Sequence, residues 1–263
     1  AIYQNLDIIY RHEPDYVLVL GGDHIYTMNY ATMLAAHVAA DAELTVGCME
    51  VPLEEAKAFG VMSVDEDFRI TRFTEKPANP EAMPGRPEYA LASMGIYICS
   101  MELLTQSLIQ DAEDSDSHHD FGKNIIPASI AKSKAIAYPF VDDHGEPAYW
   151  RDVGTIDAFW EANMELVSVE PELNLYDSDW PIRTYHRQLP SAKFVFRDPD
   201  REGKALDSVV SAGCVISGSA VVNSLLFSSV RVHSYGRIES SVLLPEAEVG
   251  RRCRIRRAVI DRG

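Results

Sequence analysis

The chain has 263 residues, of which 46% are hydrophobic and 24% are charged, so its composition is that of a folded protein rather than of a disordered one. The length fits one or two domains with a sizeable core. The formal net charge of −16 argues against nucleic acid or an anionic membrane as the main partner.

The four cysteines, Cys48, Cys99, Cys214 and Cys253, are far apart in the chain and form no CxxC pair. This spacing indicates neither a zinc site nor a disulfide framework, and it favours a reduced, cytoplasmic location. No apolar run approaches the ~20 residues of a membrane span, and the first residues do not resemble a signal peptide. Because the first residue is not Met, we expect the chain to begin within a longer protein.

The first half of the chain alternates helix and strand patterns. Apolar spacing predicts helices over residues 2–10 and 30–38. Residues 16–20 form a continuous apolar run, typical of a strand buried on both faces, and residues 44–49 predict the next strand. A strand, a helix and a strand in succession favour parallel βαβ units and an α/β fold.

Later segments continue this α/β pattern. Residues 61–64 and 68–73 flank the polar tip 65–67 and predict a hairpin. Residues 94–98 predict a further strand, and residues 156–167 predict an amphipathic helix.

The last part of the chain repeats aliphatic residues with a period of 17. The repeat forms three columns: Val215, Val232 and Val249; Val221, Ile238 and Ile255; Leu226, Leu243 and Ile260. Steps of 6, 6 and 5 residues within each repeat are typical of a left-handed parallel β-helix built from hexapeptides, and an ordinary β-sandwich is the alternative. Since no polar cap follows, we expect the chain to stop before the solenoid ends.

Two acidic residues come just after predicted strands. Asp23 follows a strand and two glycines, and Asp152 precedes the helix that begins near Ile156. Ligands of open α/β sheets bind at such strand ends, and two carboxylates with substrate phosphates suit Mg²⁺. The alternative for each acid is a helix N-cap.

Other polar segments allow a functional and a structural interpretation. Lys76 follows Glu75 at a strand end and could pair with an anionic substrate, or could be solvated surface. Ser93 could donate to a ligand or serve a turn. The run 118–120 (His-His-Asp) could bind a metal or be structural. The arginine-rich run 251–257 is either a solvated face or an anion site at a subunit or domain contact.

Seven segments together resemble one known family. They are residues 22–26, 59–62, 73–77, 92–97, 119–123, 149–155 and 180–185. With the β-helix tail, this ordered set is similar to bacterial glucose-1-phosphate adenylyltransferases, also called ADP-glucose pyrophosphorylases, over the whole length of the chain.

The resemblance implies a Rossmann-like nucleotidyltransferase domain, incomplete here, followed by a left-handed parallel β-helix. The expected organisation is the C-terminal portion of the catalytic domain at residues 1–167, a linker at 168–204 and the start of the β-helix at 205–263. From Ala205 onward the chain carries eight arginines and five acids, a charge of +3, so the first 204 residues carry −19. The glycine-rich nucleotide loop of the family lies outside this sequence.

The resemblance also implies a reaction and its residues. ATP and α-D-glucose 1-phosphate would give ADP-glucose and pyrophosphate for glycogen synthesis, in a cytoplasmic homotetramer. Asp23 and Asp152 would be catalytic and would bind Mg²⁺. The sugar phosphate would contact four residues: Gly60, Glu75, Lys76 and Ser93.

Regulation and alternatives follow from the same comparison. Glu246 and Arg262 match family positions that contribute to an AMP site, while sugar-phosphate activators would bind largely outside this sequence; a surface ion pair is the alternative for these two residues. The competing functions are transfer of another nucleotide to give UDP-, dTDP- or GDP-sugars, hexapeptide acyl transfer by His233, or a non-catalytic regulatory subunit.

Overall fold

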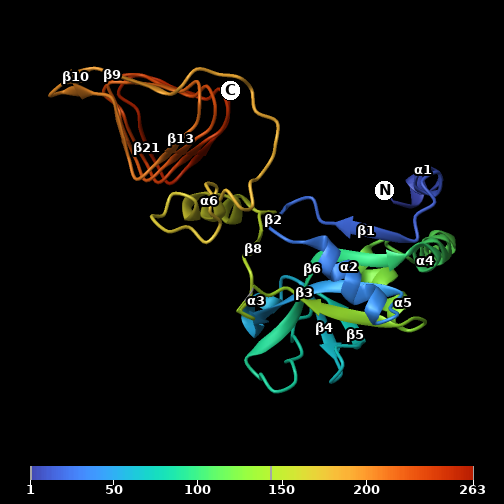
Figure 1. Ribbon diagram of the computed structural model, residues 1–263. Coiled ribbons are helices and arrows are strands. Elements are labelled where there is room, and N and C mark those ends of the chain that lie inside the picture. Colours follow the sequence, from blue (N-terminus) through green and yellow to red (C-terminus); the bar gives the residue numbers. More distant parts are fainter. Residues whose placement is uncertain (1, 143, 263) are drawn as a thin grey trace. The chain divides into compact units, whose positions relative to one another are not determined.

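The structure is a computed structural model that describes residues 2–142 and 144–262. It divides into two compact units (Figure 1). One unit comprises Ala1–Gly22 and Met28–Ala148, and the other comprises Asp23–Thr27 and Tyr149–Gly263. Among the described residues, no helix has the length and apolar character needed to cross a membrane.

A six-stranded mixed sheet forms the centre of the first unit. Its strands are β1 (Tyr16–Leu20), β3 (Leu44–Pro52), β4 (Gly60–Val64), β5 (Ile70–Glu75), β6 (Tyr89–Ser100) and β7 (Ala135–Pro139). The order is β5-β4-β6-β3-β7, and β1 also pairs with β6. The α/β class and the predicted hairpin, β4–β5, are confirmed.

The expectation of parallel βαβ units is wrong for most of the strand pairs in this sheet. Strand β6 is antiparallel to β1, β3 and β4, and only β3 and β7 pair in parallel. Strand β1 is also not buried on both faces, because Tyr16, Leu18 and Leu20 are each at least 37% exposed. An apolar run shows that a strand can be buried, but the neighbouring elements decide whether it is.

Helices pack on this sheet, and apolar spacing predicted those within residues 2–10 and 30–38 but not the others. They are η1 (Tyr3–Asn5), α1 (Leu6–Tyr10), α2 (Tyr30–Ala39), α3 (Leu53–Ala56), α4 (Met101–Glu113), η2 (Phe121–Ile125) and α5 (Ile126–Ile130). Side chains cap two of the helices: Asn29 accepts from the Ala31 amide at α2, and Ser100 accepts from the Leu103 amide at α4. Aliphatic residues of the sheet and of α4 share one buried core.

The second unit begins with a small two-stranded sheet. Strand β2 (His24–Tyr26) pairs antiparallel with β8 (Trp150–Asp152). Helix α6 (Ile156–Glu165) follows, and its last turn ends earlier than the predicted residue 167. The Trp160 indole in α6 donates to the Ser240 carbonyl oxygen at 3.0 Å, which ties α6 to the solenoid.

A parallel β-solenoid forms the rest of this unit, as predicted (Figure 1). One face contains β9 (Lys193–Val195), β14 (Val215–Ser217), β17 (Arg231–Val232) and β20 (Glu248–Val249). The second contains β12 (Lys204–Leu206), β15 (Ala220–Val222), β18 (Arg237–Glu239) and β21 (Arg254–Arg256). The third contains β13 (Val209–Val210), β16 (Leu225–Leu226), β19 (Val242–Leu243) and β22 (Val259–Ile260).

Two details of the solenoid differ from expectation. Val232 pairs with Ile216 rather than with Val215, and Ile216 is fully buried while Val215 is partly exposed. The first coil is therefore one residue shorter than 17 at the corner that contains Gly218. Strand β9 already pairs with β14, so solenoid pairing begins within residues 168–204, the segment expected to be a linker.

Candidate active site

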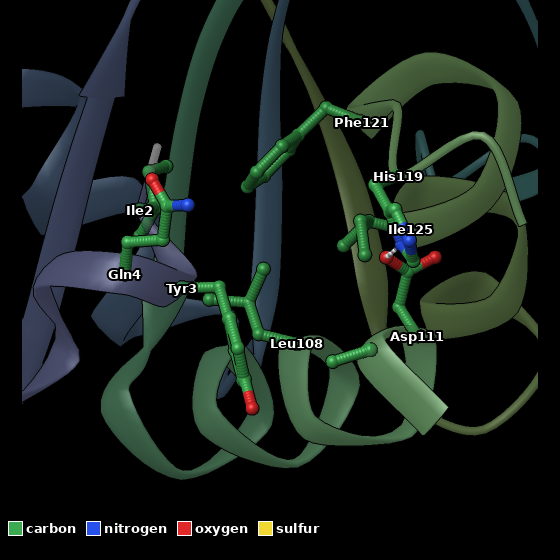
Figure 2. A pocket seen from close by; sticks show the side chains of 9 residues that line it. Ile2, Tyr3, Gln4, Leu108, Asp111, His119, Phe121 and Ile125 are labelled. Carbon is green, nitrogen blue, oxygen red and sulfur yellow. Dashed lines mark hydrogen bonds and ion pairs between the residues drawn. The ribbon is translucent and has the colours of Figure 1, made fainter. Parts of the chain in front are cut away.

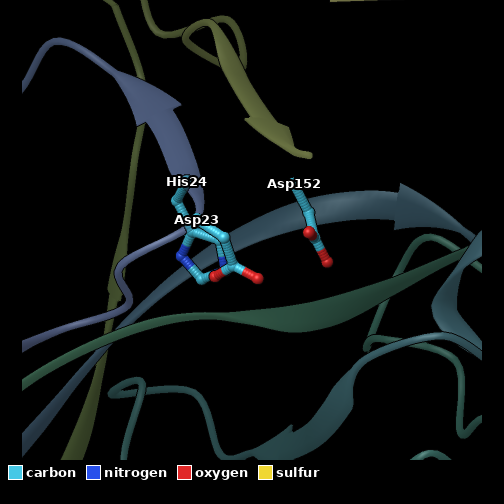
Figure 3. Close-up of side chains that lie close together, drawn as sticks. All are labelled: Asp23, His24 and Asp152. Carbon is cyan, nitrogen blue, oxygen red and sulfur yellow. The ribbon is translucent and has the colours of Figure 1, made fainter. Parts of the chain in front are cut away.

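Two carboxylates and an imidazole converge in the second unit. Asp23 immediately precedes β2, and Asp152 ends β8, where it pairs in register with His24. One ligand atom from each of the three residues lies within 4.8 Å of the others (Figure 3). The antiparallel pairing of two short strands thus brings together acids that are separated by more than a hundred residues in the chain.

Neither acid caps a helix. Asn29 caps the helix that follows Asp23, and Thr155 caps the helix that follows Asp152, with its hydroxyl accepting from the Ala158 amide. The helix-cap alternative for Asp23 and Asp152 is therefore wrong.

Local hydrogen bonds hold the acids in place. The Gly154 amide donates to Asp152 Oδ1 at 2.8 Å, and the Val153 amide donates to the Asp23 carbonyl oxygen at 3.0 Å. A Cβ atom on Gly154 would lie 3.0 Å from Asp152 Oδ1 and 3.2 Å from Asp23 Oδ2. Any side chain at this position would crowd both carboxylates, so the glycine keeps the space beside them open.

This donor set fits a hard divalent cation. Mg²⁺ binds through one or two carboxylates together with substrate phosphates, and Asp23 and Asp152 supply two such groups. His24 Nε2 lies 3.5 Å from Asp23 Oδ1, and the His24 ring packs edge-on against Trp150 with centroids 4.9 Å apart. The imidazole therefore lies beside the Asp23 carboxylate.

An ion-pair network fixes strand β8 to helix α6. Arg151 Nε donates to Glu165 at 3.1 Å, and Arg151 Nη2 donates to Glu172 at the same distance. The Tyr149 hydroxyl also donates to Glu165, and burial together with this hydrogen bond raises the pKa of Tyr149 to about 12. These contacts flank Asp152 and limit its movement.

A second group of predicted residues lies in the first unit. Glu75 ends β5, where it pairs with Gly60 on β4, and Lys76 follows with a left-handed φ of 44°. Burial raises the pKa of Glu75, and Asp120 raises it further, while Lys76 and Lys123 oppose the effect. The exposed Lys76 ammonium forms no ion pair with any described residue, so it is free to meet an anion.

Two glycines make room for the Glu75 carboxylate. A Cβ atom on Gly60 would lie 2.9 Å from Glu75 Oε2, and one on Gly122 would lie 2.4 Å from the same atom. The structure therefore gives Gly60 a packing role next to the Glu75 side chain. Sequence reasoning named Gly60 but missed Gly122 and Asp120, although both lie in the 119–123 segment.

Ser93 belongs to the same neighbourhood. It is buried on β6, its hydroxyl lies 3.4 Å from the Tyr97 hydroxyl, and it accepts from the Gly95 amide at 3.3 Å. The Tyr97 ring stacks on Phe121 with centroids 5.7 Å apart. The sequence contained no signal for the Tyr97–Phe121 pair, because one ring comes from strand β6 and the other from helix η2.

The His118–His119 run has a structural role in part. His119 Nδ1 lies 2.8 Å from Asp111, and Ser117 also donates to Asp111. Burial raises the pKa of Asp111, but the hydrogen bonds from Ser117 and His119 outweigh this effect, so the pKa is lowered. Asp111 and His119 line an apolar cavity of about 490 Å³, together with Tyr3 and Leu108 (Figure 2). Because Asp111 and His119 bind each other, neither offers a free charge to a substrate.

Glu246 and Arg262 form the ion pair that their 16-residue separation suggested. Arg262 Nη1 donates to Glu246 Oε2 at 3.0 Å. Arg187 Nη1 donates to the other carboxylate oxygen at 2.7 Å, a contact with the 168–204 segment that the sequence did not reveal. Hydrogen bonds from Arg187 and Arg262 lower the pKa of Glu246.

The fold and the paired acids define a nucleotidyl transferase with a hexapeptide solenoid. Residues 1–169 match the family model described as nucleotidyl transferase, and residues 190–263 match the one described as GlmU-like, C-terminal hexapeptide. The chain belongs to the nucleotidyl transferase family.

Named relatives narrow the resemblance. The chain is 58% identical to the glucose-1-phosphate adenylyltransferase of Nitrosococcus oceani and 58% identical to that of Hydrogenovibrio crunogenus. It is 59% identical to glucose-1-phosphate adenylyltransferase 2 of Alkalilimnicola ehrlichii. Each match covers the whole of this chain but only 62–63% of the relative, so the chain spans less than two thirds of their length.

Proposed function

We propose that the protein containing this chain is a glucose-1-phosphate adenylyltransferase, which joins ATP and α-D-glucose 1-phosphate to give ADP-glucose and pyrophosphate. The observation that supports this reaction best is the convergence of the Asp23 and Asp152 carboxylates in a nucleotidyl transferase. The names of the relatives, at 55–59% identity along the whole chain, supply the two substrates.

The chemistry requires alignment of two anions rather than a protein nucleophile. An oxygen of the sugar phosphate forms a bond to the α-phosphorus of ATP, and the bond from that phosphorus to the bridging oxygen of pyrophosphate breaks. In our proposal Asp23 and Asp152 hold Mg²⁺, which would neutralise charge on the transferring phosphate. The task of both acids in this step would be to bind and orient the ion.

We assign sugar-phosphate binding to the group around Glu75. The Lys76 ammonium would pair with the phosphate as a point charge, and the Glu75 carboxylate would accept from sugar hydroxyls. Ser93 would donate a further hydrogen bond from its buried position, and Gly60 would preserve the space that Glu75 occupies. The exposed Lys76 and the restrained Glu75 support this division of labour.

Regulation and assembly are further parts of the proposal. AMP would bind at Glu246 and Arg262, with the guanidinium meeting the phosphate, and sugar phosphates would act as activators. The protein would be a cytoplasmic homotetramer that serves glycogen synthesis. The observed Arg187–Glu246–Arg262 bridge supports a site at these residues, because a bound phosphate can replace Glu246 as the partner of both arginines.

Substrate comparison tests the proposed function directly. The whole protein is assayed for pyrophosphate release with α-D-glucose 1-phosphate and Mg²⁺, using ATP, UTP, dTTP or GTP in turn. We expect kcat/KM for ATP to exceed the others by at least about a hundredfold. Preference for another nucleotide would assign the protein to a different sugar nucleotide, and absence of release with all four would indicate a regulatory subunit.

A further inference from the structure

One corner of the solenoid carries three arginines around a single tyrosine. The guanidinium carbons of Arg201, Arg251 and Arg252 lie 5.7, 5.5 and 5.5 Å from the centroid of the Tyr235 ring. We call these four residues the Tyr235 cluster. The arginine-rich run 251–257, whose role the sequence left open between a solvated face and an anion site, supplies two of its members.

The backbone of successive coils builds this corner. Gly218, Tyr235 and Arg252 all have left-handed φ angles, of 62°, 69° and 60°. The Tyr235 amide donates to the Gly218 carbonyl oxygen at 2.7 Å, and the Arg252 amide donates to the Ser234 carbonyl oxygen at 3.0 Å. Such a conformation is rare for residues other than glycine, so the coil pairing holds Tyr235 and Arg252 at fixed places.

Arg201 occupies the place of the side chain that Gly218 lacks. It lies in β11 (Arg201–Glu202), which forms a hairpin with β10 (Arg197–Asp198). A Cβ atom on Gly218 would lie 2.5 Å from Arg201 Cγ. The guanidinium carbon is 3.3 Å from the ring centroid of Phe196, and Arg201 Nε donates to the Ser234 hydroxyl at 3.1 Å. The guanidinium is therefore stacked and oriented before any ligand binds.

The positive charge of the cluster is not neutralised within the described chain. None of its three arginines forms an ion pair with a described carboxylate, whereas Arg237 pairs with Glu239 on the same solenoid. Three like charges gathered near one ring repel one another, and stacking on an aromatic face offsets only part of this cost. Their N–H edges are left without a counter-charge.

We infer that the Tyr235 cluster binds the phosphoryl group of a small molecule. Guanidinium groups present planar sets of donors that match the oxygens of a phosphate, and a dianion would relieve the repulsion among the three arginines. The net charge of −16 on the chain disfavours a long polyanion such as nucleic acid, whereas a single phosphoryl group needs only local positive charge. The site shares no residue with the proposed substrate or AMP groups.

Equilibrium dialysis of the whole protein with radiolabelled inorganic phosphate, at constant ionic strength, tests this inference. The variants are the double substitution Arg251→Gln/Arg252→Gln, the single substitution Tyr235→Leu and the matched control Arg237→Gln. We expect the wild type and the control to bind phosphate with the same affinity at this site. The double variant should lose at least about tenfold in affinity, and Tyr235→Leu should lose less.

The outcomes separate specific binding from general charge. Saturable binding that the double variant loses and the control keeps supports the site, with circular dichroism showing that each variant is folded. Absence of saturable binding in the wild type, equal loss in the control or no loss in the double variant would overturn it. If glycerol 3-phosphate competes more strongly than unlabelled phosphate, the natural ligand is a phosphate ester. If unlabelled phosphate competes more strongly, the ligand is the free phosphate ion.

Discussion

A Cβ atom on Gly122 would lie 2.4 Å from Glu75 Oε2, so this glycine of helix η2 leaves room for the carboxylate at the end of strand β5. Gly60 also leaves room for this carboxylate, because a Cβ atom there would lie 2.9 Å from Glu75 Oε2 and 2.3 Å from Phe73 Cζ. Two residues without side chains thus provide the space for a charged residue that we assign to substrate binding.

The Gly122→Ala substitution tests this relationship. We expect it to displace the Glu75 carboxylate, to raise KM for glucose 1-phosphate about tenfold and to destabilise the protein by about 1–3 kcal/mol through overpacking. Steady-state kinetics and thermal unfolding measure the two effects. The control is Gly250→Ala, where the new Cβ would have only an ordinary contact at 3.6 Å with Cys253 Sγ. An unchanged KM in Gly122→Ala would contradict the role of Gly122.

The Glu75 charge is predicted to reduce stability at neutral pH. Because burial and then Asp120 raise the pKa of Glu75, the folded state holds this proton to a higher pH than the unfolded chain does. Stability therefore falls as pH rises from the ordinary glutamate pKa through the raised value. Glu75→Gln removes this loss, so the unfolding temperature of the variant should rise relative to that of the wild type as the pH increases above the ordinary glutamate pKa.

Thermal unfolding at several pH values checks this prediction, with the exposed Glu55→Gln as the control for loss of one negative charge. The same Glu75→Gln variant should bind glucose 1-phosphate more weakly. A variant that is less stable than the wild type at pH 7 would show that the ionised carboxylate stabilises the fold.

Lys76 is expected to act on one substrate only. Lys76→Ala should raise KM for glucose 1-phosphate about 10- to 100-fold and change KM for ATP little, because a single point charge to the sugar phosphate is lost. Lys57→Ala removes a lysine whose ammonium is paired with Glu54 at 2.6 Å and serves as the control. Equal increases in the KM values for glucose 1-phosphate and ATP would contradict the assignment of Lys76 to binding of the sugar phosphate.

Arg262 provides a test of regulation. Arg262→Ala in the whole protein should weaken inhibition by AMP about tenfold while turnover without AMP stays near the wild-type value. Arg187→Ala tests whether the second arginine on Glu246 shares this role. If AMP inhibits the Arg262→Ala variant as it does the wild type, the Glu246–Arg262 contact is only an exposed ion pair, which contributes ~1 kcal/mol or less.

The sequence predicted best the features that depend on local patterns. The 17-residue aliphatic period identified the solenoid, since each coil repeats the same inward positions. The period failed at Val215 because Gly218 lies in a shorter corner, which moves Ile216 inward. Strand patterns identified β1 and β6 but not their antiparallel pairing, because alternation does not specify a partner.

The candidate site shows the same limit. Asp23 and Asp152 could be proposed because each lies where a strand pattern ends within a recognisable motif. His24 was missed because its contact with Asp23 depends on the β2–β8 pairing, and Gly122 because nothing in its own segment indicates Glu75. The Tyr235 cluster draws on three parts of the chain that only the folding of the solenoid brings together: Arg201, Tyr235 and the neighbours Arg251 and Arg252.

The central claim is that Asp23 and Asp152 hold the catalytic metal, and kcat of the Asp23→Asn variant in the whole protein tests it most directly. Asparagine keeps the shape and removes the charge. We predict that kcat falls by at least about a hundredfold at saturating ATP, glucose 1-phosphate and Mg²⁺, while the KM for glucose 1-phosphate changes much less. A folded Asp23→Asn variant that retains turnover near the wild-type value would contradict the claim.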